Sequence, residues 1–175
     1  ETQWQDPARA AWFGRLLPGT GADVIGIQEF WDDGLVPGFL NNYGPTFPMY
    51  PDQRVTESWN ILGFDVDIPF SLNSGMMLTS PTPLSQRVEI PYGAEDGFFE
   101  SLATKSFQRA TLAKGGLFVG VFHTHTQADT SGTATNARRV QMLELGVAIQ
   151  QYRQANPTHP VIVMGDLNVI ADSSE

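Results

Sequence analysis

Residues 116–126 read Gly-Leu-Phe-Val-Gly-Val-Phe-His-Thr-His-Thr and are the most strand-like stretch of the sequence. Apolar and small residues run through it without a charge until the histidines, which is typical of a buried strand. Residues 135–155 follow with apolar positions at helical spacing, and residues 160–164 (Pro-Val-Ile-Val-Met) predict a second buried strand. This order of strand, helix and strand predicts an α/β fold.

The helix at 135–155 is expected to pack on a sheet. Val140, Leu143 and Val147 fall on one stripe of that helix and predict its packed face, with Met142, Leu145, Ile149 and Tyr152 beside the stripe. The long helix and the strands on either side of it form the C-terminal part of the predicted core.

The chain before residue 116 adds one short helix and several short strands. Asp6 and Pro7 are an N-cap and a first-turn proline, so a helix is expected from there to the stop at Pro18-Gly19. Residues 23–28 suit a buried strand, and residues 35–58 are expected to be loop with at most one helical turn. Further strands are expected at 59–66, 74–80, 84–90 and 107–112. The largely β middle predicts a layered α/β sandwich with mainly antiparallel sheets.

Composition limits the classes of function. The chain has 175 residues, 41% of them hydrophobic and 17% charged, which predicts one globular domain over 1–175. The formal net charge of -9 disfavours nucleic acid as a partner, although a metal enzyme can be acidic because carboxylates recruit the cation. The absence of cysteine excludes disulfides, thiolate zinc sites and cysteine nucleophiles. The compartment stays open, with a secreted or extracellular protein as the favoured interpretation.

Polar side chains follow three of the predicted strands. Gln28-Glu29, the segment 123–125 and Asp166-Leu167-Asn168 each come directly after an apolar run. Taken singly, each has an ordinary structural explanation: a solvated loop glutamate, a hydrogen-bonded edge histidine and an Asx-rich turn. Because layered α/β folds gather strand ends at one rim, we expect the three groups to lie together.

Such a set suits phosphoryl transfer assisted by a hard divalent cation. Glu29 can offer a carboxylate oxygen to Mg²⁺, and water and substrate phosphate can complete the coordination. Asp166 can orient an attacking water, Asn168 can hydrogen-bond a phosphoryl oxygen, and His125 can donate to the developing oxyanion. Lys114 could add a cation near the phosphate, and an exposed lysine at the start of a strand is the equally open alternative.

Five segments, in order along the chain, resemble the endonuclease/exonuclease/phosphatase superfamily. They are 22–29 (Ala-Asp-Val-Ile-Gly-Ile-Gln-Glu), 74–80 (Ser-Gly-Met-Met-Leu-Thr-Ser), 113–116 (Ala-Lys-Gly-Gly), 124–128 (Thr-His-Thr-Gln-Ala) and 165–168 (Gly-Asp-Leu-Asn). The second, third and fourth are most similar to the neutral sphingomyelinase-like branch. The helix start of that branch, Arg-x-x-Gln, is approximated by Arg138 and Gln141.

The resemblance implies a four-layered, DNase I-like α/β sandwich and a Mg²⁺-dependent phosphodiesterase. It implies Glu29 as a metal ligand, His125 as a phosphate or leaving-group contact, and Asp166 with Asn168 in the catalytic shell. Together with the suggestion for Lys114 made above, the residues expected to contact the substrate are Lys114, His125 and Asn168.

The sequence also departs from the family at both ends. The family begins with a strand that carries a catalytic Asn and ends with an Asp-His whose imidazole is the general base, and neither is found in these residues. His159 precedes a strand and is expected at the wrong strand end to replace that base. We therefore expect residues 1–175 to be one domain without the first and last family segments, with little hydrolysis by this chain alone.

Three functions remain open from the sequence. The first is hydrolysis of a phospholipid headgroup, the second is a nuclease of the same superfamily, and the third is a non-catalytic module that binds metal or phosphate. The ten basic residues are scattered, and only Arg138-Arg139 are adjacent, which favours the first over the second. Phe98-Phe99 could form a loop tip that makes a peripheral membrane contact, or could pack in the core.

Overall fold

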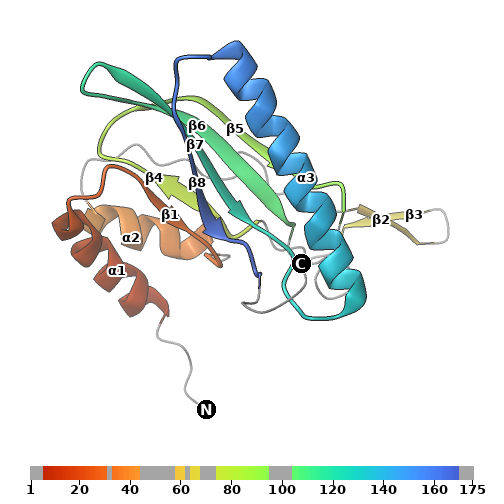
Figure 1. The fold of residues 1–175 in the computed structure, drawn as a ribbon. Helices are drawn as coiled ribbons and strands as arrows, with labels where there is room; N and C mark the ends of the chain where they lie inside the picture. The colour runs from red at the N-terminus through yellow and green to blue at the C-terminus, as the bar shows by residue number, and fades with distance from the viewer. Residues whose placement is uncertain are drawn as a thin grey trace.

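The computed structural model describes residues 6–30, 33–43, 58–61, 64–67, 74–94 and 104–169. The helices among them are α1 (Asp6–Leu16), α2 (Val36–Tyr43) and α3 (Gly132–Ala155), with 3-10 turns η1 (Leu17–Thr20) and η2 (Asp33–Leu35). The strands are β1 (Ile25–Ile27), β2 (Ser58–Ile61), β3 (Phe64–Asp67), β4 (Met77–Thr79), β5 (Leu84–Pro91), β6 (Ser106–Lys114), β7 (Leu117–His125) and β8 (Val161–Asp166). Figure 1 shows α1 and α2 on one side of the sheets and α3 on the other.

A four-stranded sheet forms the centre of the fold, with the strand order β5-β6-β7-β8. The pairs β5–β6 and β6–β7 are antiparallel, whereas β7 and β8 run parallel. The long crossover through α3 is what a parallel pair requires. The predicted α/β class with mainly antiparallel sheets is confirmed.

Helix α3 covers one face of this sheet. Ser131 caps it by accepting a hydrogen bond from the backbone N–H of Ala134 at 3.1 Å. Aromatic and aliphatic side chains fill the space between helix and sheet: Tyr92, Phe107, Phe122, Leu145 and Tyr152. Tyr152 meets the sheet at Gly120, where a Cβ would lie 2.4 Å from the tyrosine ring.

The predicted packed stripe of α3 is wrong. Leu143 is 70% exposed and Val147 is 53% exposed, so these two residues face outward. The buried residues of the helix are Ala134, Ala137, Arg138, Gln141, Leu145 and Tyr152. Two of these are long polar side chains that bond to backbone groups, and hydrophobicity alone therefore selected the wrong stripe.

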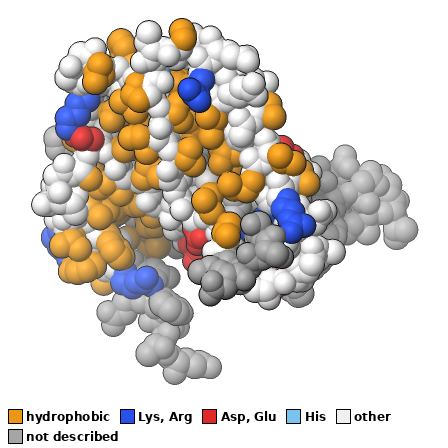
Figure 2. Space-filling view, in the orientation of Figure 1, with side chains coloured by type: hydrophobic (Ala, Val, Ile, Leu, Met, Phe, Trp, Pro, Cys, Tyr) orange, Lys and Arg blue, Asp and Glu red, His pale blue; other side chains and the backbone are white. Residues whose placement is uncertain are grey.

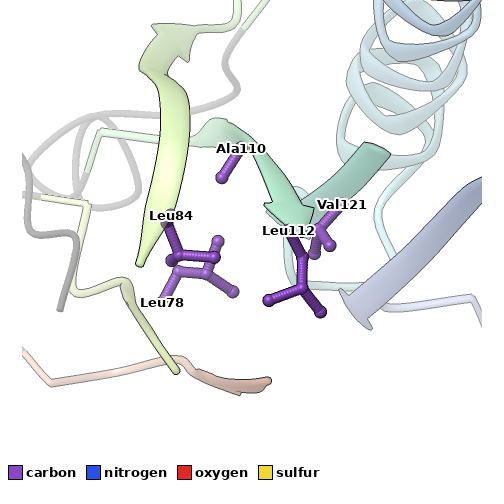
Figure 3. Close-up of a cluster of buried hydrophobic side chains, with 5 residues drawn as sticks. All are labelled: Leu78, Leu84, Ala110, Leu112 and Val121. Atoms are coloured by element: carbon purple, nitrogen blue, oxygen red, sulfur yellow. The ribbon is translucent and has the colours of Figure 1, made fainter. Parts of the chain in front are cut away.

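The second sheet pairs β1 with β4 and lies against the inner face of the central sheet. Its residues meet those of β5, β6 and β7 in a buried apolar cluster of Leu78, Leu84, Ala110, Leu112 and Val121, shown in Figure 3. Alternation along β7 therefore points Val121 toward the second sheet and Phe122 toward α3.

Helices α1 and α2 form the outer layer on the side away from α3 (Figure 1). Ala10, Phe39, Tyr43 and Met77 make the cluster that joins them to the second sheet. Helix α2 is longer than the single helical turn allowed for residues 35–58, because Pro37, Gly38 and two asparagines make that stretch resemble a loop. Phe39 and Tyr43, one turn apart and both buried, are the signal that identifies it. The order helix, sheet, sheet, helix makes four layers.

Several predicted strands have different bounds in the structure. The single strand expected at 59–66 is the antiparallel hairpin β2–β3, with Ile61 opposite Phe64. The strand expected at 74–80 is shortened to β4, and the strand expected at 107–112 lengthens to β6. The expected loop tip at Phe98-Phe99 lies outside the described residues.

Large apolar side chains are exposed on several elements of the described chain. They are Trp12, Phe13 and Leu16 on α1, Leu117 and Phe118 on β7, Met142, Leu143 and Val147 on α3, Ile162 and Val163 on β8, and Val169. Figure 2 shows apolar side chains spread over the face on which α3 and β8 lie in front. No described helix is long and apolar enough to cross a membrane.

Candidate active site

The parallel pairing of β7 and β8 brings two of the predicted site residues together. His125 ends β7, Asp166 ends β8, and the two are direct partners in the strand register. The backbone N–H of Thr126 donates to the Asp166 carbonyl oxygen at 3.0 Å and extends the pairing by one residue. The imidazole and the carboxylate therefore lie side by side at the same edge of the sheet.

Gly165 permits this close pairing. Its φ of 133° lies in a region that favours glycine, and a Cβ at this position would lie 1.9 Å from the carbonyl oxygen of Thr124. Any larger residue at position 165 would push β8 away from β7 just before Asp166.

The segment after β8 folds into a tight Asx turn. The Asn168 N–H donates to Asp166 Oδ1 at 2.8 Å, and Asn168 Nδ2 donates to the Thr126 carbonyl oxygen at 2.9 Å. Asn168 has a φ of 49°, a left-handed conformation that asparagine tolerates better than most residues. The turn interpretation is thus confirmed for this segment, and the turn also holds Asn168 beside Asp166.

His125 is 3% exposed and sits among charged neighbours. Burial, together with the positive charge of Lys105, lowers its pKa to about 4, and the Asp166 carboxylate opposes this change only in part. At neutral pH the imidazole is therefore uncharged, and it can donate one N–H without carrying a positive charge. Sequence reasoning missed Lys105, which precedes β6 and is 4% exposed.

Glu29 follows β1 with a φ of 59°, which is a strained conformation for a glutamate. Its two chain neighbours are both anchored. Gln28 Nε2 lies 2.6 Å from His123 Nε2, and the Phe30 N–H donates to the Gly75 carbonyl oxygen at 2.7 Å. Since His123 is two residues before His125 on the same face of β7, about 7 Å along the strand, Glu29 lies at the same end of the sandwich. Its side chain is exposed.

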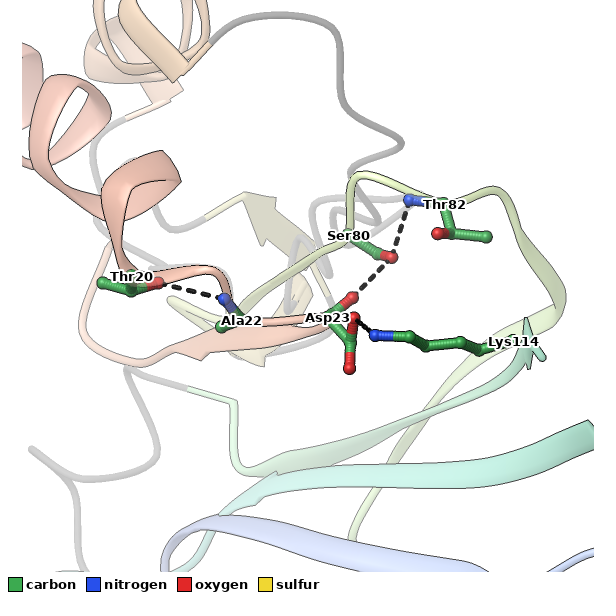
Figure 4. A network of polar contacts seen from close by, with 6 residues as sticks. All are labelled: Thr20, Ala22, Asp23, Ser80, Thr82 and Lys114. Carbon is green, nitrogen blue, oxygen red and sulfur yellow. Dashed lines mark hydrogen bonds and ion pairs between the residues drawn. The ribbon is translucent and has the colours of Figure 1, made fainter.

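Lys114 is not brought to this end. It ends β6 and lies opposite Leu117, the first residue of β7. Leu117 is eight residues before His125, which is about 26 Å along the strand. Figure 4 shows its ammonium group paired with the Asp23 carboxylate, next to the bond from Ser80 to the Asp23 carbonyl. The sequence-based placement of Lys114 near a phosphate at His125 is therefore corrected, and Lys105 is the cation that influences His125.

The loop after His125 is braced from α3. Arg138 is 1% exposed and donates to the carbonyl oxygens of Gln127 at 3.0 Å and Asp129 at 2.5 Å. Gln141 Oε1 accepts from the Gln127 N–H at 2.7 Å. The Arg-x-x-Gln pattern therefore fixes the backbone that continues from the site, and the Arg138 guanidinium faces the protein interior.

The donor set fits a hard cation with few protein ligands. The described residues contain no group of three or more His, Cys, Asp or Glu side chains arranged to hold a metal ion. Mg²⁺ commonly binds through one or two carboxylates and completes its shell with water and substrate phosphate, whereas Zn²⁺ needs three or four protein ligands. Glu29, with Asp166 at the same end, is compatible with the first pattern.

Solved structures with the same fold include beta toxin, a sphingomyelinase C and TDP2. A beta hairpin deletion mutant of beta toxin from Staphylococcus aureus superposes with a TM-score of 0.78 at 23% identity, over 98% of this chain and 63% of that chain. Sphingomyelinase C from Streptomyces griseocarneus gives 0.74 at 22% identity, over 98% and 60%. TDP2 from Caenorhabditis elegans gives 0.68 at 16% identity, over 97% and 45%.

These likenesses establish the fold, and the chain spans 60% and 63% of the lengths of the two bacterial structures. Another beta toxin structure in the group contains bound magnesium ions. No protein of curated function matches the chain by sequence at a significant level.

The sequence pattern of one family covers nearly the whole chain. It matches residues 3–175, including the strand ends that carry Glu29, His125 and Asp166. The chain belongs to the Endonuclease/Exonuclease/phosphatase family.

Proposed function

We propose that this chain carries the site of a Mg²⁺-dependent phosphodiesterase that hydrolyses a phospholipid headgroup, as a sphingomyelinase does. The observation that carries the proposal is the meeting of His125, Asp166 and Asn168 at the parallel β7–β8 edge, with Glu29 at the same end. Membership of a family of phosphodiester hydrolases and the fold shared with sphingomyelinase C support it.

Each residue has a role that its surroundings permit. Glu29 would hold Mg²⁺, and the bound cation would neutralise charge on a phosphate. Asp166 Oδ1 is occupied by the Asn168 N–H, which orients the carboxylate so that its other oxygen can accept a hydrogen bond from an attacking water. Neutral His125 would donate an N–H to the oxygen on which negative charge develops.

Charge placement favours a lipid headgroup over a nucleic acid. Binding to duplex DNA relies on several cations aligned along a surface, since affinity grows with the number of neutralised phosphates. In the adjacent basic pair Arg138-Arg139, Arg138 is buried and bonded to loop carbonyls. Lys114, elsewhere in the chain, is paired with Asp23 at the far end of β7. A single headgroup phosphate needs only the cation and one or two donors.

A binding comparison with a turnover measurement tests the proposal. The chain is mixed with sphingomyelin vesicles or a short DNA duplex in the same Mg²⁺ and salt, and phosphocholine release is compared with plasmid nicking. We expect tighter binding to the vesicles and any phosphocholine release to exceed nicking. His125→Gln should abolish any phosphocholine release, because it removes the donor to the developing negative charge. His159 lies just before β8, where it contacts Tyr152, and His159→Gln is the matched control that should preserve the release.

Two outcomes would contradict the proposal. Tighter binding and faster nicking of DNA would make the protein a nuclease of the same family. Mg²⁺-dependent vesicle binding with no turnover in any length of the protein would indicate a non-catalytic binding module.

A further inference from the structure

A row of hydrogen-bonded polar side chains crosses the interior of the sandwich beneath the site. Glu89, Gln108 and His123 are direct cross-strand partners on β5, β6 and β7. Gln108 Nε2 donates to Glu89 Oε2 at 3.0 Å, and Gln108 Oε1 lies 3.2 Å from His123 Nδ1. His123 and Gln108 are both fully buried, so the row is a costly feature that a simple apolar core would not need.

The row leaves the central sheet at His123 and continues into the second sheet. His123 Nε2 lies 2.6 Å from Gln28 Nε2, and Gln28 immediately precedes Glu29. The imidazole also rests on the backbone of β1, since a Cβ at Gly26 would lie 2.6 Å from His123 Cδ2. His123 therefore lies against β1 at Gly26 and also meets Gln28, the residue that follows β1.

The partners define the protonation of the ring. Gln108 offers an oxygen to Nδ1, so Nδ1 carries the proton, and Nε2 accepts from the Gln28 amide. Burial, with a smaller effect of His125, lowers the pKa of His123 to about 4, and the ring is therefore neutral at physiological pH. At physiological pH the His123 Nε2 atom therefore still accepts a hydrogen bond from the Gln28 amide.

The anchoring matters because Glu29 is both exposed and strained. A non-glycine residue keeps a positive φ only where its surroundings hold it there. The neighbours of Glu29 supply that hold: the Gln28 side chain bonds to His123, and the Phe30 N–H bonds to Gly75. The backbone under Glu29 is thus fixed from both sides, while its carboxylate stays open to solvent.

We propose that His123 is a positioning residue for Glu29: held by Gln108, its imidazole fixes Gln28 and so presents the Glu29 carboxylate to the cation. The inference rests on the proposed function, because it takes Glu29 as the Mg²⁺ ligand. Removing a group that orients a metal ligand typically lowers the metal affinity tenfold to a hundredfold.

Variants at His123 separate positioning from simple packing. The amide of His123→Gln can reach the Nε2 position and still accept from Gln28, whereas the shorter His123→Asn can reach only the Nδ1 position and bond Gln108. We measure Mg²⁺ affinity by calorimetry under conditions where circular dichroism shows each variant to be folded. His123→Asn should bind Mg²⁺ about tenfold more weakly, and His123→Gln should stay within about twofold of the parent chain.

A second route avoids disturbing the buried ring. Gln28→Met preserves length but loses the amide, and it should weaken Mg²⁺ binding about as much as His123→Asn. The double variant that combines Gln28→Met with His123→Asn should bind Mg²⁺ no more weakly than either single variant, because both changes break the same contact. Tyr152→Phe removes a buried hydroxyl from the opposite face of the same sheet and is the matched control, with unchanged Mg²⁺ affinity expected.

The outcomes distinguish this inference from the proposed function. If Glu29→Gln weakens Mg²⁺ binding while Gln28→Met and a folded His123→Asn bind Mg²⁺ like the parent chain, the positioning role is overturned and the metal site stands. If Glu29→Gln itself leaves the affinity unchanged, the metal assignment fails and takes the inference with it.

Discussion

Acidification should destabilise this protein through His123 in a way that can be calculated. In the folded chain burial, with a smaller effect of the nearby His125, lowers the pKa of His123 from 6.5 to about 4. The unfolded chain therefore binds the proton more tightly than the folded chain. The stabilisation from keeping the ring neutral is fully present above pH 6.5 and is lost as the pH falls toward 4.

The two pKa values set the size of the effect. Linkage between protonation and unfolding gives a loss of about 2 kcal/mol at pH 5 and about 3 kcal/mol at pH 4, relative to pH 7.5. Small domains have unfolding free energies of about 5–15 kcal/mol, so one histidine accounts for a large fraction of the total.

The assay compares the parent chain with His123→Gln. Urea unfolding at pH 7.5 and pH 5 gives the unfolding free energy of each protein, and the carboxylates that titrate in this range are common to both. We expect the parent chain to lose about 2 kcal/mol more than the variant between the two pH values. An equal loss in both proteins would show that His123 is not held neutral by burial, and the hydrogen-bonding scheme drawn for the ring would be wrong.

Three substitutions test other parts of the fold. Gly165→Ala places a Cβ against the Thr124 carbonyl and should cost more than about 3 kcal/mol of unfolding free energy; a thermal midpoint close to that of the parent would refute the β7–β8 geometry. Tyr152→Phe loses bonds to Thr111 and His159 and should cost about 1–2 kcal/mol in urea unfolding, so a neutral result would mean that these bonds are not formed. Ser131→Ala removes the cap of α3 and should cost about 1 kcal/mol, whereas Ser131→Asp should restore most of it, and failure of that rescue would count against the cap.

The sequence predicts the elements of the central sheet because each has a local signature. Residues 116–126 give β7 almost to the residue, since an apolar run without charges has few other uses. Proline and glycine mark the ends of α1 equally well. The length of helix α2 is underestimated because Pro37 and Gly38 are usually loop formers, and the packing of Phe39 and Tyr43 reveals the whole helix.

The site could be predicted at the level of strand ends and not at the level of neighbours. The expectation that strand ends gather at one rim agrees with the register that pairs His125 with Asp166, and the roles of Glu29, His125, Asp166 and Asn168 stay predictions. Lys114 was misplaced because a hairpin returns the chain to the opposite end of the sheet, and that distance depends on strand length and register. Sequence spacing gives neither the strand length nor the register.

The residues that support the site were harder to see than the residues expected to do chemistry. Gln28, His123 and Gln108 lie 95 and 15 residues apart along the chain, and their relation appears only when two sheets are stacked. Their sequence signal was a polar residue inside an otherwise apolar strand, which also fits an ordinary edge position.

Strain and polar contacts between layers explain why this site needs the whole sandwich. Glu29 and Asn168 both hold positive φ angles, and both are held by bonds to elements other than their own strand. For Glu29 the bond is made by its neighbour Gln28 to β7, and for Asn168 it is made by its own amide to Thr126.

An apolar core tolerates small sliding of one sheet over the other, because hydrophobic contact is not directional. A hydrogen bond between layers tolerates far less, since it weakens steeply with misalignment. The polar row therefore sets the alignment of the two sheets, and that alignment in turn sets the position of the carboxylate relative to His125 and Asp166.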